Sequence, residues 1–301
     1  MSEKRVIALG FFDGVHLGHQ ALLTMAVQRA AELQAVPAAL TFDAHPDQVV
    51  FGQEVLLLNT PEDRCRLLRR YGMEEVLVIR FDRSVAAMPW ETFAEQLVTV
   101  HHACHVVCGH DFTFGHRGLG NAEKLREKCD AMGIGCDVIG EVSRDGITVS
   151  STHLRQLIAD GDMEQAAAFL GHPHLLTGTV IRGKQLGRTI GIPTANVALP
   201  PAVLPPRFGV YACRIHTETG VYAAVTNVGL RPTVCDNLGI LIEPWLLDYA
   251  GDLYGQTVCV EFRKFLRPEQ KFASLAQLQT AVLQNAKETK DYFASAPITV
   301  G

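Results

Sequence analysis

The first thirty residues contain an apolar run, a glycine-bearing turn and a helix-like stretch, and this order constrains the fold more than any other feature. The pattern of residues 5–9 predicts a buried strand, and residues 20–30 have the composition and periodicity of a helix. Between them, residues 10–19 have the sequence GFFDGVHLGH. A turn from a strand into a helix points backbone N–H groups and the positive end of the helix dipole at one spot, which suits a phosphate.

Two histidines lie in this turn. His16 and His19 are three residues apart, so one face of the first helical turn can carry both imidazoles. Gly10 and Gly14 allow the backbone to turn without a Cβ clash, and Gly18 lets a ligand approach closely. Imidazoles over a phosphate would stabilise the charge that develops during phosphoryl or nucleotidyl transfer. The alternative is an ordinary turn with two solvated histidines.

Short apolar runs alternate with helix-like segments through the first half of the chain. Further strands are predicted at residues 36–42, 76–79, 106–109 and 136–139, with helices starting near residues 60, 89 and 121. This alternation is typical of a parallel sheet covered on both faces. Ligands in such sheets bind at the carboxyl ends of strands, which is where the histidine turn lies.

The length and composition favour a two-domain globular protein. The chain has 301 residues, of which 48% are hydrophobic and 20% charged, and its net charge is −5. This charge does not favour a nucleic acid or an anionic membrane as partner. No apolar run is long enough to span a bilayer, and the start lacks a signal-peptide hydrophobic region, so we expect a cytoplasmic protein.

The eight cysteines are scattered, which indicates reduced thiols rather than a disulfide framework. Residues 101–108, HHACHVVC, contain ligand types that suit zinc. However, residues 106–108 are predicted as the end of a buried strand, which would turn Cys108 inward as a small apolar residue. We therefore favour a strand here over a metal site.

Two more segments of the first half fall at sites where a ligand could bind. Residues 109–115, GHDFTFG, follow a predicted strand, and residues 150–155, SSTHLR, place hydroxyls at a helix start with an arginine one turn on. The alternatives are an aromatic-bearing loop that closes the core and a plain helix N-cap.

The sequence pattern changes from residue 172 onward. Short strands at residues 177–181, 209–215, 221–225, 241–243, 246–249 and 256–262 are separated by glycine and proline turns, which predicts a small antiparallel barrel. A final helix has a possible capping box at Ser274 and Gln277. Its apolar stripe of Leu275, Leu278 and Val282 is interpreted as core rather than ligand site, and residues 295–301 as a loose tail.

A second glycine-rich stretch lies at residues 183–196, GKQLGRTIGIPTAN. Its glycines permit a loop whose N–H groups face a phosphate, although the Gly-Lys-Ser/Thr ending of a Walker loop is missing. Thr194 and Asn196 offer two neutral oxygens, which can hold Mg²⁺ when ATP phosphates supply the negative charge. The alternative is a glycine-rich hairpin loop.

The motifs of both halves, in this order, resemble one family. Residues 10–19, 109–115 and 150–155 resemble the adenylyltransferase half of the bacterial bifunctional riboflavin kinase/FAD synthetases, which belong to the His-x-Gly-His nucleotidyltransferases. The Pro-Thr-Ala-Asn segment, with residues 229–233, 252–255 and 266–272, resembles their riboflavin kinase module. The resemblance implies an α/β Rossmann-like nucleotidyltransferase domain with a parallel sheet at residues 1–172. A small antiparallel β-barrel kinase domain with a C-terminal helix would follow at residues 173–301.

The resemblance also implies the function. Such an enzyme phosphorylates riboflavin to FMN with ATP and Mg²⁺, then adenylylates FMN to FAD with a second ATP and releases pyrophosphate. We expect a monomer or weak homo-oligomer without nucleic-acid or membrane partners. The alternatives are that only one module is active, or that the chain is a non-catalytic flavin-binding regulator, which would not need His16, His19, Asn196 and Glu243 together.

The residue roles that the resemblance implies fall into four groups. The catalytic residues would be His16, His19 and Glu243. ATP in the adenylyltransferase site would contact Gly10, Phe11, Phe12, Asp13, His16, Gly18, His19, Asp111, Ser151, Thr152 and Arg155. ATP in the kinase site would contact Gly183, Lys184, Gly187, Arg188, Gly191 and Pro193. Thr194 and Asn196 would bind the metal, and Arg267, Tyr254 and Phe272, with Tyr249 as a further candidate, would bind the flavin.

One position departs from the family pattern. The family usually carries a strand-friendly residue after the catalytic glutamate, whereas this chain has Pro244. Because proline lacks a ladder donor, we expect Pro244 at a sheet edge or a bulge.

Overall fold

The computed structural model describes residues 3–183, 187, 191–200, 202–230 and 239–295. By their contacts these residues form two compact units, and each is described by itself. The first comprises Met1–Leu57 and Pro61–Ser151, and the second Leu58–Thr60 and Thr152–Gly301. The sequence-based domain boundary after residue 172 stays a prediction.

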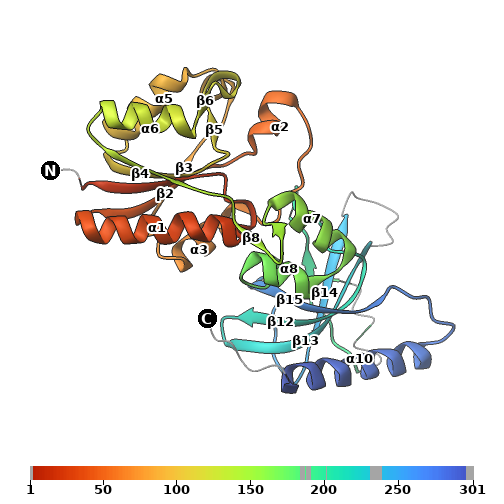
Figure 1. Ribbon diagram of the computed structural model, residues 1–301. Coiled ribbons are helices and arrows are strands. Elements are labelled where there is room, and N and C mark those ends of the chain that lie inside the picture. Colours follow the sequence, from red (N-terminus) through yellow and green to blue (C-terminus); the bar gives the residue numbers. More distant parts are fainter. Residues whose placement is uncertain (1–2, 184–186, 188–190, 201, 231–238, 296–301) are drawn as a thin grey trace. The chain divides into compact units, whose positions relative to one another are not determined.

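The first unit is built on a parallel sheet of five strands, as the sequence predicts. The strands are β1 (Arg5–Leu9), β2 (Val36–Phe42), β3 (Glu75–Ile79), β4 (Ala103–Gly109) and β7 (Gly135–Ile139), in the order β3-β2-β1-β4-β7. Helices α1 (Leu17–Leu33) and α3 (Pro61–Arg70) cover one face, and α5 (Trp90–Thr99) and α6 (Ala122–Ala131) the other (Figure 1). The order reverses between β1 and β4, and ligands bind at such a switch point.

The remaining elements of the first unit are short. They are η1 (Asp13–Val15), α2 (Pro46–Phe51), α4 (Arg83–Ala86), β5 (Thr113–Phe114), η2 (His116–Gly118), β6 (Gly120–Asn121), β8 (Ser143–Arg144) and β9 (Ile147–Thr148). The expected 109–115 loop thus contains a two-residue strand, β5, which pairs with β6.

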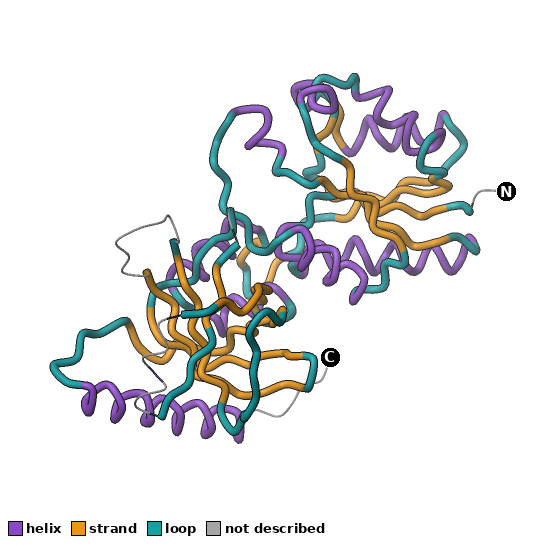
Figure 2. The backbone as a smooth tube through the Cα atoms, turned by 180° about the vertical axis from the view of Figure 1, so that it is seen from behind, coloured by secondary structure: helices purple, strands orange, loops and turns teal. Residues whose placement is uncertain are grey.

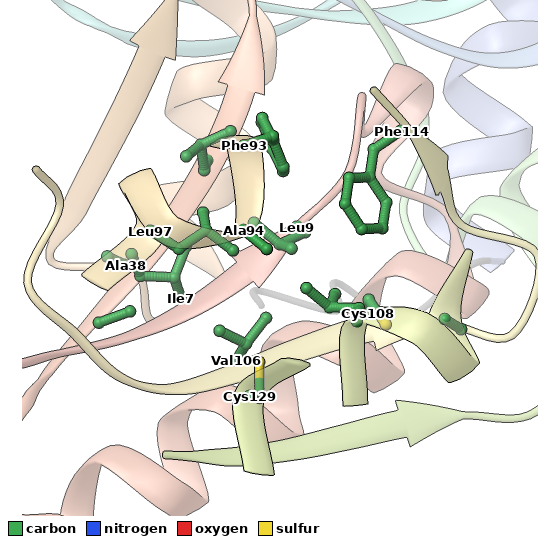
Figure 3. Packing of buried hydrophobic residues seen from close by; sticks show 14 of the residues in the cluster. Ile7, Leu9, Ala38, Phe93, Ala94, Leu97, Val106, Cys108, Phe114 and Cys129 are labelled. Carbon is green, nitrogen blue, oxygen red and sulfur yellow. The ribbon is translucent and has the colours of Figure 1, made fainter. Parts of the chain in front are cut away.

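The core on one side of the sheet packs against α5 and α6 (Figure 3). Ile7 and Leu9 from β1 and Val106 and Cys108 from β4 point into it and are fully buried. Cys108 therefore lies inward on a buried strand, as predicted. Phe114 also belongs to this cluster, so at this position the loop closes the core.

Gly115 illustrates how closely this region is packed. Its φ is +74°, and an added Cβ would lie 2.5 Å from Cα of Trp90. Gly115→Ala is expected to lower the free energy of unfolding by about 2–5 kcal/mol, from left-handed strain of about 1–2 and overpacking of about 1–3. Gly133→Ala is the matched control, because Gly133 has φ +73° with nothing within 4 Å. Urea unfolding measures both, and equal losses would contradict the packing argument.

The second unit contains a closed antiparallel barrel in the order β10-β11-β14-β13-β12-β15, which confirms the predicted barrel. Its strands are β10 (His174–Ile181), β11 (Asn196–Ala198), β12 (Gly209–Thr217), β13 (Gly220–Leu230), β14 (Ile240–Leu246) and β15 (Thr257–Pro268). Helix α7 (Ser151–Asp160) precedes α8 (Met163–Leu170), and α8 contacts β10 and β15. The C-terminal helix α10 (Leu275–Ser295) runs along β12 and β13 (Figure 2).

Strand β14 differs from the prediction. The two expected segments at residues 241–243 and 246–249 form one strand that ends at Leu246, shortly before the left-handed Asp248 (φ 59°). Pro244 continues this strand because β11 pairs only with residues 241 and 242. The oxygen of Pro244 accepts a hydrogen bond from the Ala195 N–H at 2.9 Å, beyond the end of that ladder. In an antiparallel strand the nitrogen of a residue faces the same way as its oxygen, so the missing N–H breaks no bond to β13.

The predicted capping interactions of α10 are present. Ser274 Oγ accepts from the Gln277 N–H at 3.3 Å, and Gln277 Oε1 accepts from the Ala273 N–H at 3.1 Å. The expected tail lies outside the described residues beyond residue 295. Within the described part of the chain, no helix has the length and apolar character needed to cross a membrane.

Candidate active sites

The turn after β1 is held in an unusual backbone conformation. Phe12, Gly14 and Val15 have φ values of 59°, 80° and 43°. Thr41 Oγ1, on β2, donates to the carbonyl of Phe11 at 2.9 Å. A turn with three left-handed residues persists only where its surroundings enforce it, and such conformations concentrate at functional sites.

The two histidines of the motif are brought together. His16 is the N-cap of α1, and its Nδ1 accepts a hydrogen bond from the His19 N–H at 3.3 Å. The two rings stack with centroids 3.6 Å apart and planes 14° apart. Because Nδ1 of His16 accepts, the proton of the neutral ring is on Nε2, which can donate to a phosphate oxygen. A Cβ on Gly18 would lie 3.2 Å from the His16 ring, so Gly18 also makes room for that imidazole.

His19 is held in its neutral form. Burial is the main cause that keeps the pKa of His19 well below its ordinary value of 6.5, and the electrostatic effects of His16 and Arg64 lower it further. Its Nδ1 is enclosed and has no hydrogen-bond partner among the residues that the structure describes. At neutral pH this ring can therefore donate one N–H hydrogen bond without carrying a charge.

The other predicted residues of this site differ in how far they are buried. Phe12 is fully buried and meets His19 edge-on at 5.3 Å, so Phe12 could meet a nucleotide only through its backbone. Ser151 Oγ, at the end of the first unit, donates to the carbonyl of Asp13 at 3.1 Å. Thr152 is exposed and Arg155, one turn further along α7, is half-buried, and Asp111 is exposed just after β4.

Sequence reasoning missed Arg64. This arginine of α3 has no exposed surface and contributes to the low pKa of His19. The available signal is its spacing, since Arg64 lies three and four residues before the buried Leu67 and Leu68, on the apolar face of the helix.

The second unit contains a cavity of about 410 Å³. Its apolar wall consists of Ile192, Val210, Val225, Trp245, Phe272, Leu278 and Val282. Its polar lining consists of Gly187, Thr194, Asn227, Glu243, Arg267, Glu269 and Gln270. An apolar wall facing a few convergent polar groups is typical of a small-molecule site.

Polar contacts position two of these side chains. Asn227 Nδ2 donates to Glu243 Oε2 at 3.4 Å, from the neighbouring strand β13. Arg267 Nε donates to Oδ1 of the buried Asn285 on α10 at 3.0 Å. The carboxylate of Glu243 and the guanidinium of Arg267 therefore reach the cavity on side chains that neighbours hold in place.

The glycine-rich stretch approaches this cavity closely. Asn196 is buried at the start of β11, and a Cβ on Gly183 would overlap its amide. A Cβ on Gly187 would overlap the carbonyl of Ile192. Both glycines are thus needed for the backbone to pack here, whereas Gly191 adopts φ +74° in open space. Pro193 is exposed, and the predicted Lys184 and Arg188 lie outside the described residues.

The flavin candidates divide into two groups. Arg267 and Phe272 line the cavity. Tyr254 is not among the lining residues, and its ring lies 5.4 Å from the Arg182 guanidinium. Tyr249 packs edge-on against Tyr222 at 4.8 Å.

The interpretation of the α10 stripe as core is wrong for all three of its members. Leu278 and Val282 line the cavity, and Leu275 is exposed. The physical reason is that α10 lies over the barrel, so its apolar face meets the cavity. Sequence reasoning also missed Asn227 and Trp245. Trp245 could have been found from strand alternation, because it lies two residues after Glu243 and shares its face.

The fold and the two sites define a class of protein: a nucleotidyltransferase-type α/β unit with a paired-histidine turn, and a barrel with a cavity suited to phosphate transfer. The family model described as FAD synthetase matches residues 1–153, and the model described as riboflavin kinase matches residues 170–293. The chain belongs to the bifunctional riboflavin kinase/FMN adenylyltransferase family, which confirms the resemblance seen in its motifs.

Curated relatives carry that name. The protein of Listeria monocytogenes is 33% identical, and those of Bacillus subtilis and Escherichia coli K12 are 34% identical. Each match covers 97% of this chain and 93% of the relative. A crystal structure of a Streptococcus pneumoniae protein named macrolide-efflux protein superposes with a TM-score of 0.86 at 30% identity. That match covers 96% of this chain and 95% of the other.

Proposed function

We propose that this chain phosphorylates riboflavin to FMN in the barrel cavity and transfers AMP from a second ATP to FMN at the paired-histidine turn. The observation that carries the proposal is the presence of two separate sites, each within its own family-model match. Both reactions are displacements at phosphorus, which enzymes catalyse by positioning and charge.

In the kinase step, Glu243 orients the terminal ribityl hydroxyl of riboflavin and accepts its proton. The hydroxyl oxygen then attacks the γ-phosphorus of ATP, and ADP leaves. Asn227 holds the carboxylate in place through the 3.4 Å contact. The isoalloxazine ring occupies the apolar wall of the cavity, near Phe272 and Arg267. The backbone around Gly183, Gly187, Gly191 and Pro193, with Lys184 and Arg188, binds ATP.

Thr194 and Asn196 fit the Mg²⁺ that this family uses with ATP. Both supply neutral oxygens, and Gly183 leaves the space that the Asn196 amide occupies. Neutral ligands suit a site in which nucleotide phosphates provide the negative charge. The ion neutralises phosphate charge when bound, while Thr194 and Asn196 fix where the phosphates lie.

In the adenylyl step, a phosphate oxygen of FMN attacks the α-phosphorus of ATP, and pyrophosphate leaves. His16 and His19 donate hydrogen bonds to the phosphate oxygens as charge builds up. Ser151, Thr152 and Arg155 bind the triphosphate at the start of α7. The backbone from Gly10 to Asp13, with Gly18 and Asp111, completes the nucleotide site.

The proposal also covers the localisation, oligomeric state and partners of the protein. We place it in the cytoplasm as a monomer or weak homo-oligomer. Its net charge of −5 supports the absence of nucleic-acid and membrane partners.

A time course with riboflavin, ATP and Mg²⁺ tests the function, with the flavins separated by chromatography. FMN followed by FAD is the expected result. FMN alone would mean that the adenylyltransferase site is inactive. Tight flavin binding without either product would indicate a non-catalytic regulator and would overturn the proposal.

Trp245 provides a direct test of the flavin position. The chain has two tryptophans, and Trp245 lines the cavity whereas Trp90 lies in the first unit. Riboflavin without ATP is expected to quench the fluorescence of a Trp90→Phe variant but not that of Trp245→Phe. Because an aromatic pair contributes about 0.5–1.5 kcal/mol, Trp245→Leu should raise KM for riboflavin roughly 2- to 13-fold with kcat unchanged. Quenching that persists in Trp245→Phe would place the ring elsewhere.

A further inference from the structure

Arg64 is a buried cation beneath the phosphate-binding turn of the first unit. It has no exposed surface. One guanidinium nitrogen, Nη2, donates to the carbonyl of Phe42 at 2.5 Å, and the guanidinium carbon lies 4.2 Å from the centre of the Phe11 ring. Its Nε and Nη1 are enclosed and have no hydrogen-bond partner among the described residues.

The charge of Arg64 is incompletely compensated. Burial lowers the pKa of Arg64, and nearby acids, above all Asp13, act in the opposite direction. Neither its Nε nor its Nη1 meets a carboxylate among the described residues. An arginine stays protonated in a protein, and a buried cation without a close counterion is costly. Such a charge is expected where an anion arrives as part of the function.

The position of Arg64 connects two strand ends. Phe42 is the last residue of β2, and Phe11 lies in the turn after β1. Both strands end at the edge of the sheet where ligands bind. Thr41 holds the same turn from β2 through its bond to the Phe11 carbonyl. Arg64 therefore contacts the turn and the neighbouring strand end. It donates to the Phe42 carbonyl, packs against the Phe11 ring and is attracted by the charge of Asp13.

We propose that Arg64 is a positioning residue for adenylyl transfer: its buried charge holds the turn at residues 10–13 in its phosphate-binding conformation and offsets the negative charge of the bound phosphates. This inference rests on the proposed function of the paired-histidine turn. In this proposal α3 contributes a buried positive charge to the adenylyl-transfer site, which none of the residues of the 10–19 motif provides.

A pH profile separates this role from simple packing. The groups that act on His19 are its own burial, His16 on the same turn and Arg64 from α3, and all three lower its pKa. Loss of the Arg64 charge removes one of these effects, so the pKa of His19 moves up toward 6.5. If the neutral ring is the active form, the acid limb of the adenylylation rate then moves to higher pH.

Arg64→Lys and Arg64→Gln form a matched pair in the full-length protein, because lysine keeps the charge and glutamine keeps a donor for the Phe42 carbonyl. We expect Arg64→Gln to lower kcat/KM for ATP in FMN adenylylation about 10- to 100-fold, less than removal of a direct donor to the phosphate. Its acid limb should shift to higher pH. Arg64→Lys should retain several times more activity with a wild-type profile. Riboflavin phosphorylation should be unchanged in both variants.

Three results would overturn the inference. Arg64→Gln could adenylylate FMN like the wild type. Both variants could lose activity equally with unshifted pH profiles, which would show a packing role only. Circular dichroism shows whether Arg64→Gln folds. If it does not fold, Arg64→Lys serves as the test. A folded Arg64→Lys variant without adenylylation activity would exclude a role for the charge, because lysine keeps that charge. Wild-type protein that forms no FAD from FMN and ATP would instead contradict the proposed function.

Discussion

A His19→Ala chain is expected to convert riboflavin to FMN at the wild-type rate but to form FAD far more slowly. Removal of one hydrogen-bond donor to a developing oxyanion costs about 10²–10³ in kcat, so FAD formation should fall by that factor. The effect should be large because the ring is fixed by stacking on His16 at 3.6 Å and is held neutral by its surroundings. The kinase cavity is lined by residues of the second unit, so its reaction should continue.

Chromatographic separation of riboflavin, FMN and FAD measures both steps in one reaction. His116→Ala is the control, since His116 is an exposed histidine of the same unit. It should form FAD at the wild-type rate. FAD formation by His19→Ala at that rate would show that the paired imidazoles take no part in adenylyl transfer.

Glu243→Gln is expected to lose FMN formation while it keeps the conversion of FMN to FAD. It keeps the size of the side chain but removes the carboxylate that accepts the proton of the ribityl hydroxyl. A general base contributes about 10²–10⁴ to a rate, so FMN formation should fall by that factor. FMN supplied to the variant should still be converted to FAD, because the adenylyltransferase motif lies in the other unit.

Glu269→Gln provides a matched control for that substitution. Glu269 also lines the cavity. Asn227 donates its hydrogen bond to Glu243 and so orients that carboxylate for the reaction. We expect Glu269→Gln to change KM for riboflavin more than kcat. Initial rates of FMN formation over a riboflavin series measure both constants. A collapse of kcat in Glu269→Gln, with Glu243→Gln active, would exchange the roles of the two acids.

Local patterns in the sequence were enough to predict most of the architecture. Strand and helix periodicity are properties of neighbouring residues, so the parallel sheet, the barrel and the C-terminal helix could be predicted without knowledge of contacts. The histidine turn could be predicted too, because its chemistry lies within ten consecutive residues. The N-cap of α1 and the stacked rings follow from a spacing of three residues.

Other features depend on segments far apart in the chain. Arg64 lies 45 residues from His19 in sequence, and nothing in its local pattern says that Phe11 covers it. Pro244 was expected at a bulge or an edge, and only the short extent of β11 explains how it continues a strand. Leu278 and Val282 look like core residues of a helix until α10 is placed over the cavity.

The sequence by itself determined the order of the elements, the two phosphate-binding motifs and the family. The tertiary structure alone decided which side chains surround each motif: Arg64 beside the first, and Asn227 and the α10 leucine and valine around the second. The physical reason is that a motif made of consecutive residues carries its own geometry. A pocket wall instead depends on strand register and helix packing, which bring together residues whose separation in the chain contains no periodic signal.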